Sequence, residues 1–202
     1  MWYDCFVKGD IMKILNTEEI NEIVDVITSG GIVALPTDTI YGFSCLATDN
    51  NAISRLCKLK EREDGKQFIL LVSSKYDLSK LVSLSGDTQE FVLEHTPNNL
   101  TMIVNKSSSV KLADIFELPT LAIRIPDNAF LDAVLDKVGY MVSTSCNLQG
   151  EPFLNDYHSI MSAFPSIDAI VKAEPNIASP STIVDLTSEE IKVVRQGGYI
   201  IK

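Results

Sequence analysis

Apolar residues recur along this chain with two different patterns. Between residues 20 and 27 they fall at the spacing of one helix face. We expect that helix to begin at a cap on Asn16 or Thr17 and to end at Gly30. The same spacing predicts further helices over residues 51–59, 88–94, 129–137 and 157–163.

Short runs of apolar and β-branched residues lie between these helices. Such runs are typical of buried strands. We expect strands at residues 32–35, 43–47, 68–72, 101–104, 121–125, 140–144, 169–171, 182–185 and 192–195. Strands that alternate with helices indicate an α/β fold with a helix-covered sheet, and we assign the whole chain, residues 1–202, to one domain.

The composition is that of an ordinary globular protein, with 46% apolar and 22% charged residues. No apolar run approaches the ~20 residues that a helix needs to cross a bilayer. The N-terminal residues show no secretory signal, and the cysteines form no Cys-x-x-Cys pair. We therefore expect a cytoplasmic protein with reduced cysteines and no membrane span.

The formal charge of −10 argues against a surface that binds nucleic acid everywhere. It is compatible with a local anion site, because salt screens exposed charges beyond about 8 Å. Lys60, Arg62 and Lys66 form a cationic cluster just before the apolar run at residues 68–72. We interpret this cluster as a phosphate site. The alternative is a solvated loop whose cations pair with the acidic residues between them.

Hydroxyl side chains gather next to three of the predicted strands. Thr37, Thr39 and Tyr41 follow the first strand, in the sequence Pro-Thr-Asp-Thr-Ile-Tyr-Gly. Ser143 and Ser181 belong to two later segments of the same kind. Hydroxyls donate and accept hydrogen bonds, so together with the cations they indicate a bound phosphate. Any single one could equally serve a turn or a sheet edge.

These segments, in this order, resemble the YrdC-type threonylcarbamoyl-AMP synthase family over about residues 20–197. Each motif is weak alone, and the ordered set is strong. The motifs are PTDTIYG at residues 36–42, Lys60-Glu61-Arg62 with Lys66, residues 121–124, residues 143–147, residues 180–185 and Arg195-Gln196-Gly197. The resemblance implies a mixed, strongly twisted sheet that is hollowed on one face into a large cavity.

The resemblance also implies a reaction. L-threonine, bicarbonate and ATP would give threonylcarbamoyl-AMP and pyrophosphate, for the threonylcarbamoyl modification of adenosine in tRNA. The amine of threonine would capture carbon dioxide as a carbamate, whose oxygen would attack the α-phosphorus. Such a site works by positioning its reactants and neutralising charge, with Mg²⁺ accompanying ATP. The expected partners are tRNA-modifying transferase proteins, with a weak RNA contact as a further expectation.

Roles for individual residues follow from the same resemblance. Lys60 and Arg62 would be catalytic and face the triphosphate. The amino-acid end would be lined by Thr37, Thr39, Tyr41, Arg124, Ser143 and Ser181. The ATP contacts would come from Arg62, Lys66, Thr120, Ser145, Asn147 and Arg195. No metal ligands are expected from the protein itself.

For three of these residues the sequence alone does not decide the role. Arg124 ends an apolar strand and could pair with Asp127 instead of a substrate carboxylate. Asn147 could hold the backbone of its own turn instead of reading the edge of adenine. Arg195 precedes a glycine-containing tail, which we expect to be flexible and able to fold over ATP.

Other classes of site receive less support. The chain has neither a G-x-x-x-x-G-K-[ST] run nor a G-x-G-x-x-G run, and we expect His95 and His158 to be surface or structural residues. The loops at residues 63–68 and 96–99 look closer to the YciO-like branch of the superfamily, so a YciO-like paralogue with weak or altered activity is one alternative. A double-stranded RNA or nucleotide-binding module is another, against which the aromatic content of 7% counts.

Overall fold

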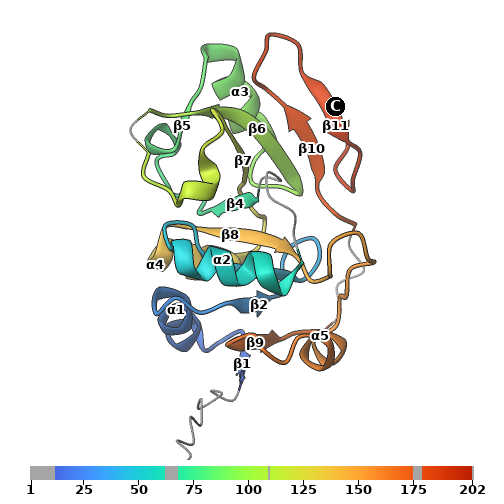
Figure 1. Cartoon of the computed structure of the whole chain (residues 1–202). Helices are drawn as coiled ribbons and strands as arrows, with labels where there is room; N and C mark the ends of the chain where they lie inside the picture. The colour runs from blue at the N-terminus through green and yellow to red at the C-terminus, as the bar shows by residue number, and fades with distance from the viewer. Residues whose placement is uncertain (1–11, 62–67, 109, 175–178, 202) are drawn as a thin grey trace, which may run out of the picture.

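The computed structural model describes residues 12–61, 68–108, 110–174 and 179–201. Within them, a mixed 11-stranded sheet runs through the molecule, with helices packed against it (Figure 1). The strand order is β1-β9-β2-β3-β8-β4-β7-β6-β10-β11, and β5 pairs with β6 off this path. The α/β fold with a twisted, helix-covered sheet is therefore confirmed.

The strands are short, and most of them coincide with an apolar run in the sequence. They are β1 (Lys13–Asn16), β2 (Val33–Leu35), β3 (Gly42–Leu46), β4 (Ile69–Val72), β5 (Val82–Ser83), β6 (Leu100–Lys106), β7 (Thr120–Arg124), β8 (Tyr140–Ser145), β9 (Ala169–Lys172), β10 (Thr182–Asp185) and β11 (Lys192–Arg195). The helices are α1 (Ile20–Thr28), α2 (Asn50–Leu59), α3 (Gly86–His95), α4 (Ala129–Val138) and α5 (Tyr157–Ala163), with single 3₁₀ turns at Leu78–Lys80 and Asp114–Phe116.

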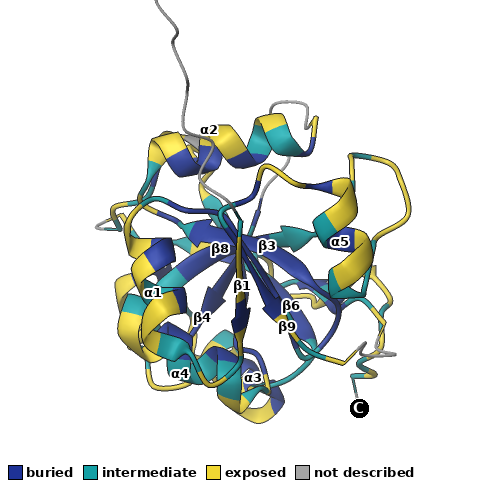
Figure 2. Ribbon diagram, turned by 90° about the horizontal axis from the view of Figure 1, so that it is seen from below, coloured by how far each residue is buried: buried dark blue, intermediate teal, exposed yellow. Residues whose placement is uncertain are grey.

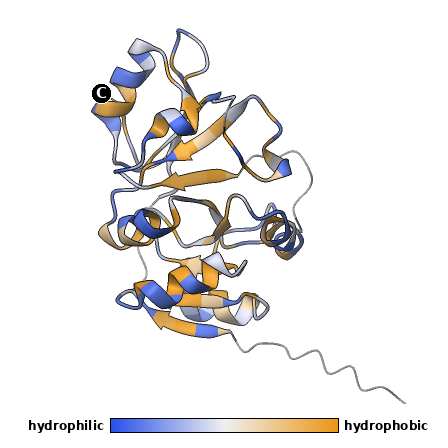
Figure 3. Cartoon of the chain, turned by 90° about the vertical axis from the view of Figure 1, so that its left-hand side faces the viewer, coloured by the Kyte–Doolittle hydropathy of each residue, from blue (hydrophilic) through white to orange (hydrophobic). Residues whose placement is uncertain are grey.

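The two faces of the sheet bury different helices. Leu70 of β4 packs into a cluster that includes α2, α3 and α5, whereas Leu71, on the other face, packs with α1 and α4. Buried strands therefore occupy the centre in Figure 2, and helices with one exposed side surround them. Figure 3 shows the same division, since the strands are largely apolar and the helices carry both polar and apolar positions.

Most predicted elements are confirmed, and two details are wrong or missing. The predicted cap on α1 is wrong, because Glu19 occupies the N-cap position and no side chain caps the helix. Asn16 instead donates from its backbone N and Nδ2 to Glu19 Oε2, at 2.7 and 2.8 Å. Gly30 ends the helix as predicted, with a φ of 84° that favours glycine. Strands β1 and β5 were not predicted.

Two expectations from composition can be compared with the fold. Among the described residues, Cys45, Cys57 and Cys146 form no disulfide, and Cys5 lies outside those residues. No helix in the described part of the chain combines the length and the apolar character that a membrane crossing needs.

Candidate functional site

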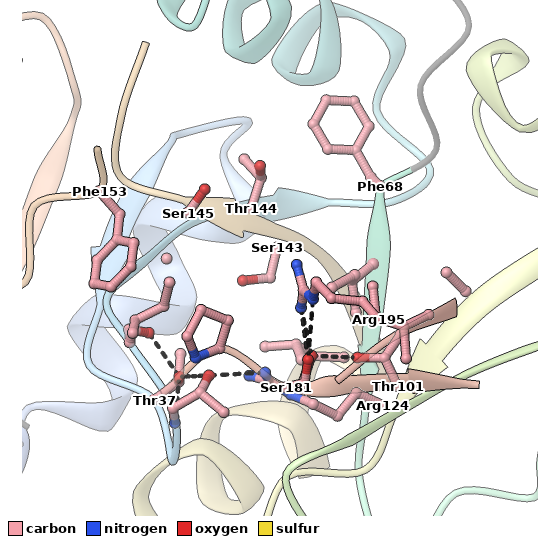
Figure 4. A pocket seen from close by; sticks show the side chains of 18 of the residues that line it. Thr37, Phe68, Thr101, Arg124, Ser143, Thr144, Ser145, Phe153, Ser181 and Arg195 are labelled. Carbon is pink, nitrogen blue, oxygen red and sulfur yellow. Dashed lines mark hydrogen bonds between the residues drawn. The ribbon is translucent and has the colours of Figure 1, made fainter. Parts of the chain in front are cut away.

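A cavity of about 440 Å³ opens on the face of the sheet that also packs α1 and α4 (Figure 4). The strand register explains why distant segments meet there. Ser143 of β8 is paired with Ile69 of β4, Ile69 with Ala122 of β7, and Ala122 with Ile103 of β6. Paired residues point to the same face, so this row forms the floor of the cavity.

Most of the predicted site residues lie on this cavity. It is lined by Thr37, Thr39, Tyr41, Arg124, Ser143, Ser145, Ser181 and Arg195. Thr120 precedes Ala122 by two residues and so belongs to the same face of β7, beyond the lining. Arg62 and Lys66 lie outside the described residues. The structure thus brings the hydroxyls and two arginines together, and their roles in binding remain predictions.

The loop after β2 is held by its own hydroxyls. Thr37 Oγ1 donates to the carbonyl of Ile40 at 2.7 Å and accepts from the backbone N of Thr39 at 3.0 Å. The hydroxyls of Thr37 and Thr39 are 2.9 Å apart, and Thr39 Oγ1 also accepts from Arg124 Nη1 at 2.8 Å. These bonds fix Thr39 and Arg124 relative to each other on the cavity wall.

The Tyr41 hydroxyl serves the fold. It is buried and donates to the carbonyl of Val171 at 2.8 Å, and burial raises the pKa of Tyr41 to about 12. Gly42 follows it on the wall, where a Cβ atom would lie 2.5 Å from Ser143 Oγ. Glycine at this position therefore lets β3 lie close to the Ser143 hydroxyl.

Arg124 forms a buried ion pair with Asp38, so the predicted alternative partner, Asp127, is wrong. The distance from Arg124 Nη2 to Asp38 Oδ1 is 3.2 Å, and the two side chains are only 6% and 4% exposed. Asp127 is exposed, and only its backbone N reaches Asp38, at 3.3 Å from Oδ2. Burial raises the pKa of Asp38, although Arg124 opposes this effect, and burial lowers the pKa of Arg124.

The Arg124–Asp38 pair leaves one buried donor without a partner. Arg124 Nε makes no hydrogen bond within the described part of the chain, and Asp38 Oδ1 contacts Arg124 only through the 3.2 Å ion pair. A buried donor without an acceptor costs about 1–3 kcal/mol. Because Arg124 lines the cavity, a ligand acceptor placed there would remove that cost.

Arg195 supplies the second positive charge on the wall. Its Nη2 and Nε donate to the carbonyl of Ser181 at 2.7 and 3.2 Å, and Nη2 lies 3.2 Å from Ser181 Oγ. Ser181 Oγ in turn lies 2.8 Å from Thr101 Oγ1 (Figure 4). No carboxylate of the described residues pairs with Arg195, so no salt bridge among them neutralises its charge.

The segment after Arg195 is docked onto the sheet, contrary to the predicted flexible tail. Gly197 N donates to Thr182 Oγ1 at 2.9 Å, and Thr182 Oγ1 donates to the carbonyl of Tyr199 at 2.5 Å. The Tyr199 hydroxyl lies 2.8 Å from Nδ1 of His95, which is buried and has this structural role. These bonds hold the chain beside the cavity.

We expect Gly197→Ala to lower the free energy of unfolding by about 1–3 kcal/mol. A Cβ atom at Gly197 would overlap the backbone of residues 180–182, which cannot rotate away. At Gly198, the nearest atom to an added Cβ is Ser179 Cβ at 3.5 Å, an ordinary contact. Chemical denaturation should therefore find Gly198→Ala close to wild type. Equal stability of the two variants would contradict the docked arrangement.

Lys60 lies beside the cavity and holds one of its edges. Its Nζ donates to the carbonyls of Ser145 and Asn147 at 2.5 and 2.7 Å and to Asn147 Oδ1 at 2.9 Å. Asn147 Oδ1 also accepts from Ser145 Oγ at 2.6 Å, and its Nδ2 donates to the carbonyl of Glu151 at 2.6 Å. Asn147 therefore holds its own turn, and Lys60 is 3% exposed and absent from the cavity lining.

Several residues at the site were not predicted. Asp38, which pairs with Arg124 and is not part of the lining, lies inside the PTDTIYG motif, where its only sequence signal is a single acid among hydroxyls. Thr101 and Phe68 lie at strands that the sequence indicated only as core. Phe153, 40% exposed, follows the Ser145 turn and reaches the cavity from a loop that has no sequence signal.

The described residues contain no group of three or more His, Cys, Asp or Glu side chains that could hold a metal ion. The charges that line the cavity come instead from arginines.

A family model and individual relatives assign this chain to the same family. The Sua5/YciO/YrdC model, described as "Telomere recombination", matches residues 25–197. The protein YciO of Escherichia coli K12, named as uncharacterized, is 30% identical over 182 residues and covers 88% of both chains. A Haemophilus influenzae protein, also named as uncharacterized, is 26% identical over 187 residues.

Solved structures show the same fold. Sua5 of P. abyssi in complex with L-threonine has a TM-score of 0.83 and 25% identity, covering 93% of this chain and 58% of that chain. The present chain therefore spans little more than half of the Sua5 protein. The structure of E. coli YciO has a TM-score of 0.80 and 27% identity, covering 93% of this chain and 94% of that one.

Proposed function

Because the chain belongs to the Sua5/YciO/YrdC family, we propose that its cavity binds L-threonine, bicarbonate and ATP and forms threonylcarbamoyl-AMP and pyrophosphate. One observation carries the proposal: hydroxyls and two arginines from separate segments converge on one cavity. The L-threonine complex of the Sua5 relative supports the choice of amino acid.

The amino-acid end of the cavity is assigned to Arg124. Its Nε is buried without a partner among the described residues, and a guanidinium matches the planar fork of a carboxylate. Thr39 and Ser143, on the same lining, would hold the hydroxyl and the amine of threonine. The amino acid would then satisfy a donor that the folded chain leaves unpaired.

The nucleotide end is assigned to Arg195 and Ser145. Arg195 has no carboxylate partner in the described part of the chain, so its charge is available to phosphate oxygens. Lys60 would act by fixing the Ser145 turn, and Arg62 and Lys66 are proposed as further phosphate contacts. The described lining holds no carboxylate, so Mg²⁺ would arrive bound to the phosphates of ATP.

In this reaction the protein would mainly position the reactants and neutralise charge. Bicarbonate gives carbon dioxide by losing hydroxide, and the threonine amine adds to that carbon dioxide and loses a proton to form a carbamate, so that water is released overall. A carbamate oxygen then forms a bond to the α-phosphorus, and the bond from that phosphorus to the β-phosphate oxygen breaks. Arg195 would neutralise charge on the phosphate oxygens during this exchange, and Arg124 would hold the threonine end in line.

The proposal is tested by pyrophosphate release from purified protein with ATP, Mg²⁺, bicarbonate and L-threonine. We expect release to require both threonine and bicarbonate. Arg124→Met should lower kcat/KM about a hundredfold, because it removes a pair of charge-assisted hydrogen bonds. Arg55→Met is the matched control, since Arg55 is 46% exposed and pairs with Asp168 outside the cavity lining.

Two outcomes would contradict the proposal. Equal release with serine or alanine would refute threonine as the substrate. ATP binding without any release under these conditions would favour the YciO-like paralogue with altered activity or a nucleotide-binding module.

A further inference from the structure

Asp38 has no role in the proposed reaction, yet it is placed next to its substrate end. The carboxylate is 4% exposed and lies 3.2 Å from Arg124, which lines the cavity. The backbone N of Asp127 contacts its Oδ2 at 3.3 Å, while Oδ1 accepts no hydrogen bond within the described residues. Asp38 thus lies behind the wall, while its two sequence neighbours, Thr37 and Thr39, line the cavity.

The pair sets the charge that a ligand meets at Arg124. Asp38 cancels the positive charge of this arginine, so the wall is neutral there, and Arg195 supplies the remaining positive charge. A carboxylate that binds Arg124 must also approach Asp38. Two negative charges a few ångströms apart repel strongly where water is excluded. An ammonium group on the same ligand would offset that repulsion.

We propose that Asp38 is a specificity-determining residue, whose charge makes the Arg124 subsite accept zwitterionic α-amino acids and reject carboxylic acids of the same shape that lack the amine. The inference rests on the proposed function, in that an amino acid binds beside Arg124. Asp38 acts through Arg124 and through its electric field and needs no contact with the ligand.

The probes are L-threonine and 3-hydroxybutyrate, which keeps the carboxylate and hydroxyl of threonine and lacks its amine. Titration calorimetry with wild-type protein should give at least tenfold weaker binding for 3-hydroxybutyrate. Asp38→Asn keeps the shape and removes the charge. It should tighten 3-hydroxybutyrate about tenfold, since the repulsion is gone. The affinity for L-threonine should change less, because the substitution removes both the repulsion between Asp38 and the threonine carboxylate and the attraction between Asp38 and the threonine ammonium.

Two variants control for effects other than charge at this position. Asp127→Asn removes an exposed acid close by and should leave both affinities unchanged. Asp38→Glu keeps the negative charge and should retain the wild-type preference for threonine. Near-ultraviolet circular dichroism checks that each variant is folded before titration.

An unchanged ratio of the two affinities in Asp38→Asn would overturn the inference. If that variant does not fold, the wild-type titrations still decide, because a preference for threonine below about threefold contradicts the repulsion argued from Coulomb's law. Binding of ATP without any binding of L-threonine would contradict the proposed function instead. The response of 3-hydroxybutyrate to Asp38→Asn would then still show whether Asp38 selects against lone carboxylates.

Discussion

Replacing Asp38 with alanine is expected to lower the free energy of unfolding by about 3–5 kcal/mol. The substitution leaves the Arg124 guanidinium buried, 6% exposed, without its counter-charge. An arginine cannot escape this cost by losing its proton at ordinary pH, even though burial lowers its pKa. Urea denaturation at pH 7 measures the loss.

The reverse substitution should cost less, and its cost should depend on pH. In Arg124→Met, the buried Asp38 can take up a proton, and burial has already raised its pKa above 3.8. Its charged form is then penalised at neutral pH, and the penalty disappears as the pH falls through that raised pKa. The stability deficit of Arg124→Met should therefore shrink in mildly acidic buffer.

The double variant Asp38→Ala/Arg124→Met is the control for this pair. It removes both charges and should recover much of the stability lost by Asp38→Ala alone, because no uncompensated charge remains. A loss below about 1 kcal/mol for Asp38→Ala, or strictly additive effects in the double variant, would contradict the buried ion pair.

Lys60→Met is expected to lower the rate of threonylcarbamoyl-AMP formation about a hundredfold. The ammonium group donates to three oxygens in the turn that carries Ser145 and Asn147. Without it, those partly buried oxygens lose a donor and the cavity edge moves away from its ordered position. The change should appear in kcat/KM measured by pyrophosphate release.

Lys58→Met is the matched control, since Lys58 belongs to the same helix end and is exposed. It should retain wild-type activity. If Lys60→Met also behaved like wild type, the turn would not need its lysine, and the placement of Ser145 in the reaction would have to be abandoned.

The fold could be predicted to a large extent because most of its helices and strands show a local spacing of apolar residues. Strands β10 and β11 and helix α5 begin and end at the predicted residues. The two-residue strand β5 is too short to show a period, and it depends on pairing with β6. The cap of α1 failed because Asn16 donates to Glu19 rather than accepting from the helix.

The sequence predicted which residues lie at the site, but it did not predict which partners they contact. The order of the hydroxyl motifs identified Thr37, Ser143 and Ser181, all of which line one cavity. The partner of Arg124 could not be predicted, because the fold brings together β7 and the loop after β2, which are far apart in the sequence, whereas proximity in the sequence favoured Asp127 over Asp38. The group that a side chain contacts also depends on residues far away in the sequence.

The contacts of Lys60 depend on such distant residues. Its sequence neighbours suggested a cation facing phosphate, whereas the structure places its ammonium on the backbone of a turn more than eighty residues later, with separations of 85 and 87. The packing of α2 against β3, which pairs with β8, determines which oxygens it reaches.

A crystal structure with L-threonine, Mg²⁺ and a non-hydrolysable ATP analogue would show whether one cavity holds the amino acid and the nucleotide together. We expect the threonine carboxylate within hydrogen-bond distance of the Arg124 guanidinium, and phosphate oxygens at Arg195 and Ser145. Ligands bound outside the cavity, or threonine placed away from Arg124, would rule out this shared binding site.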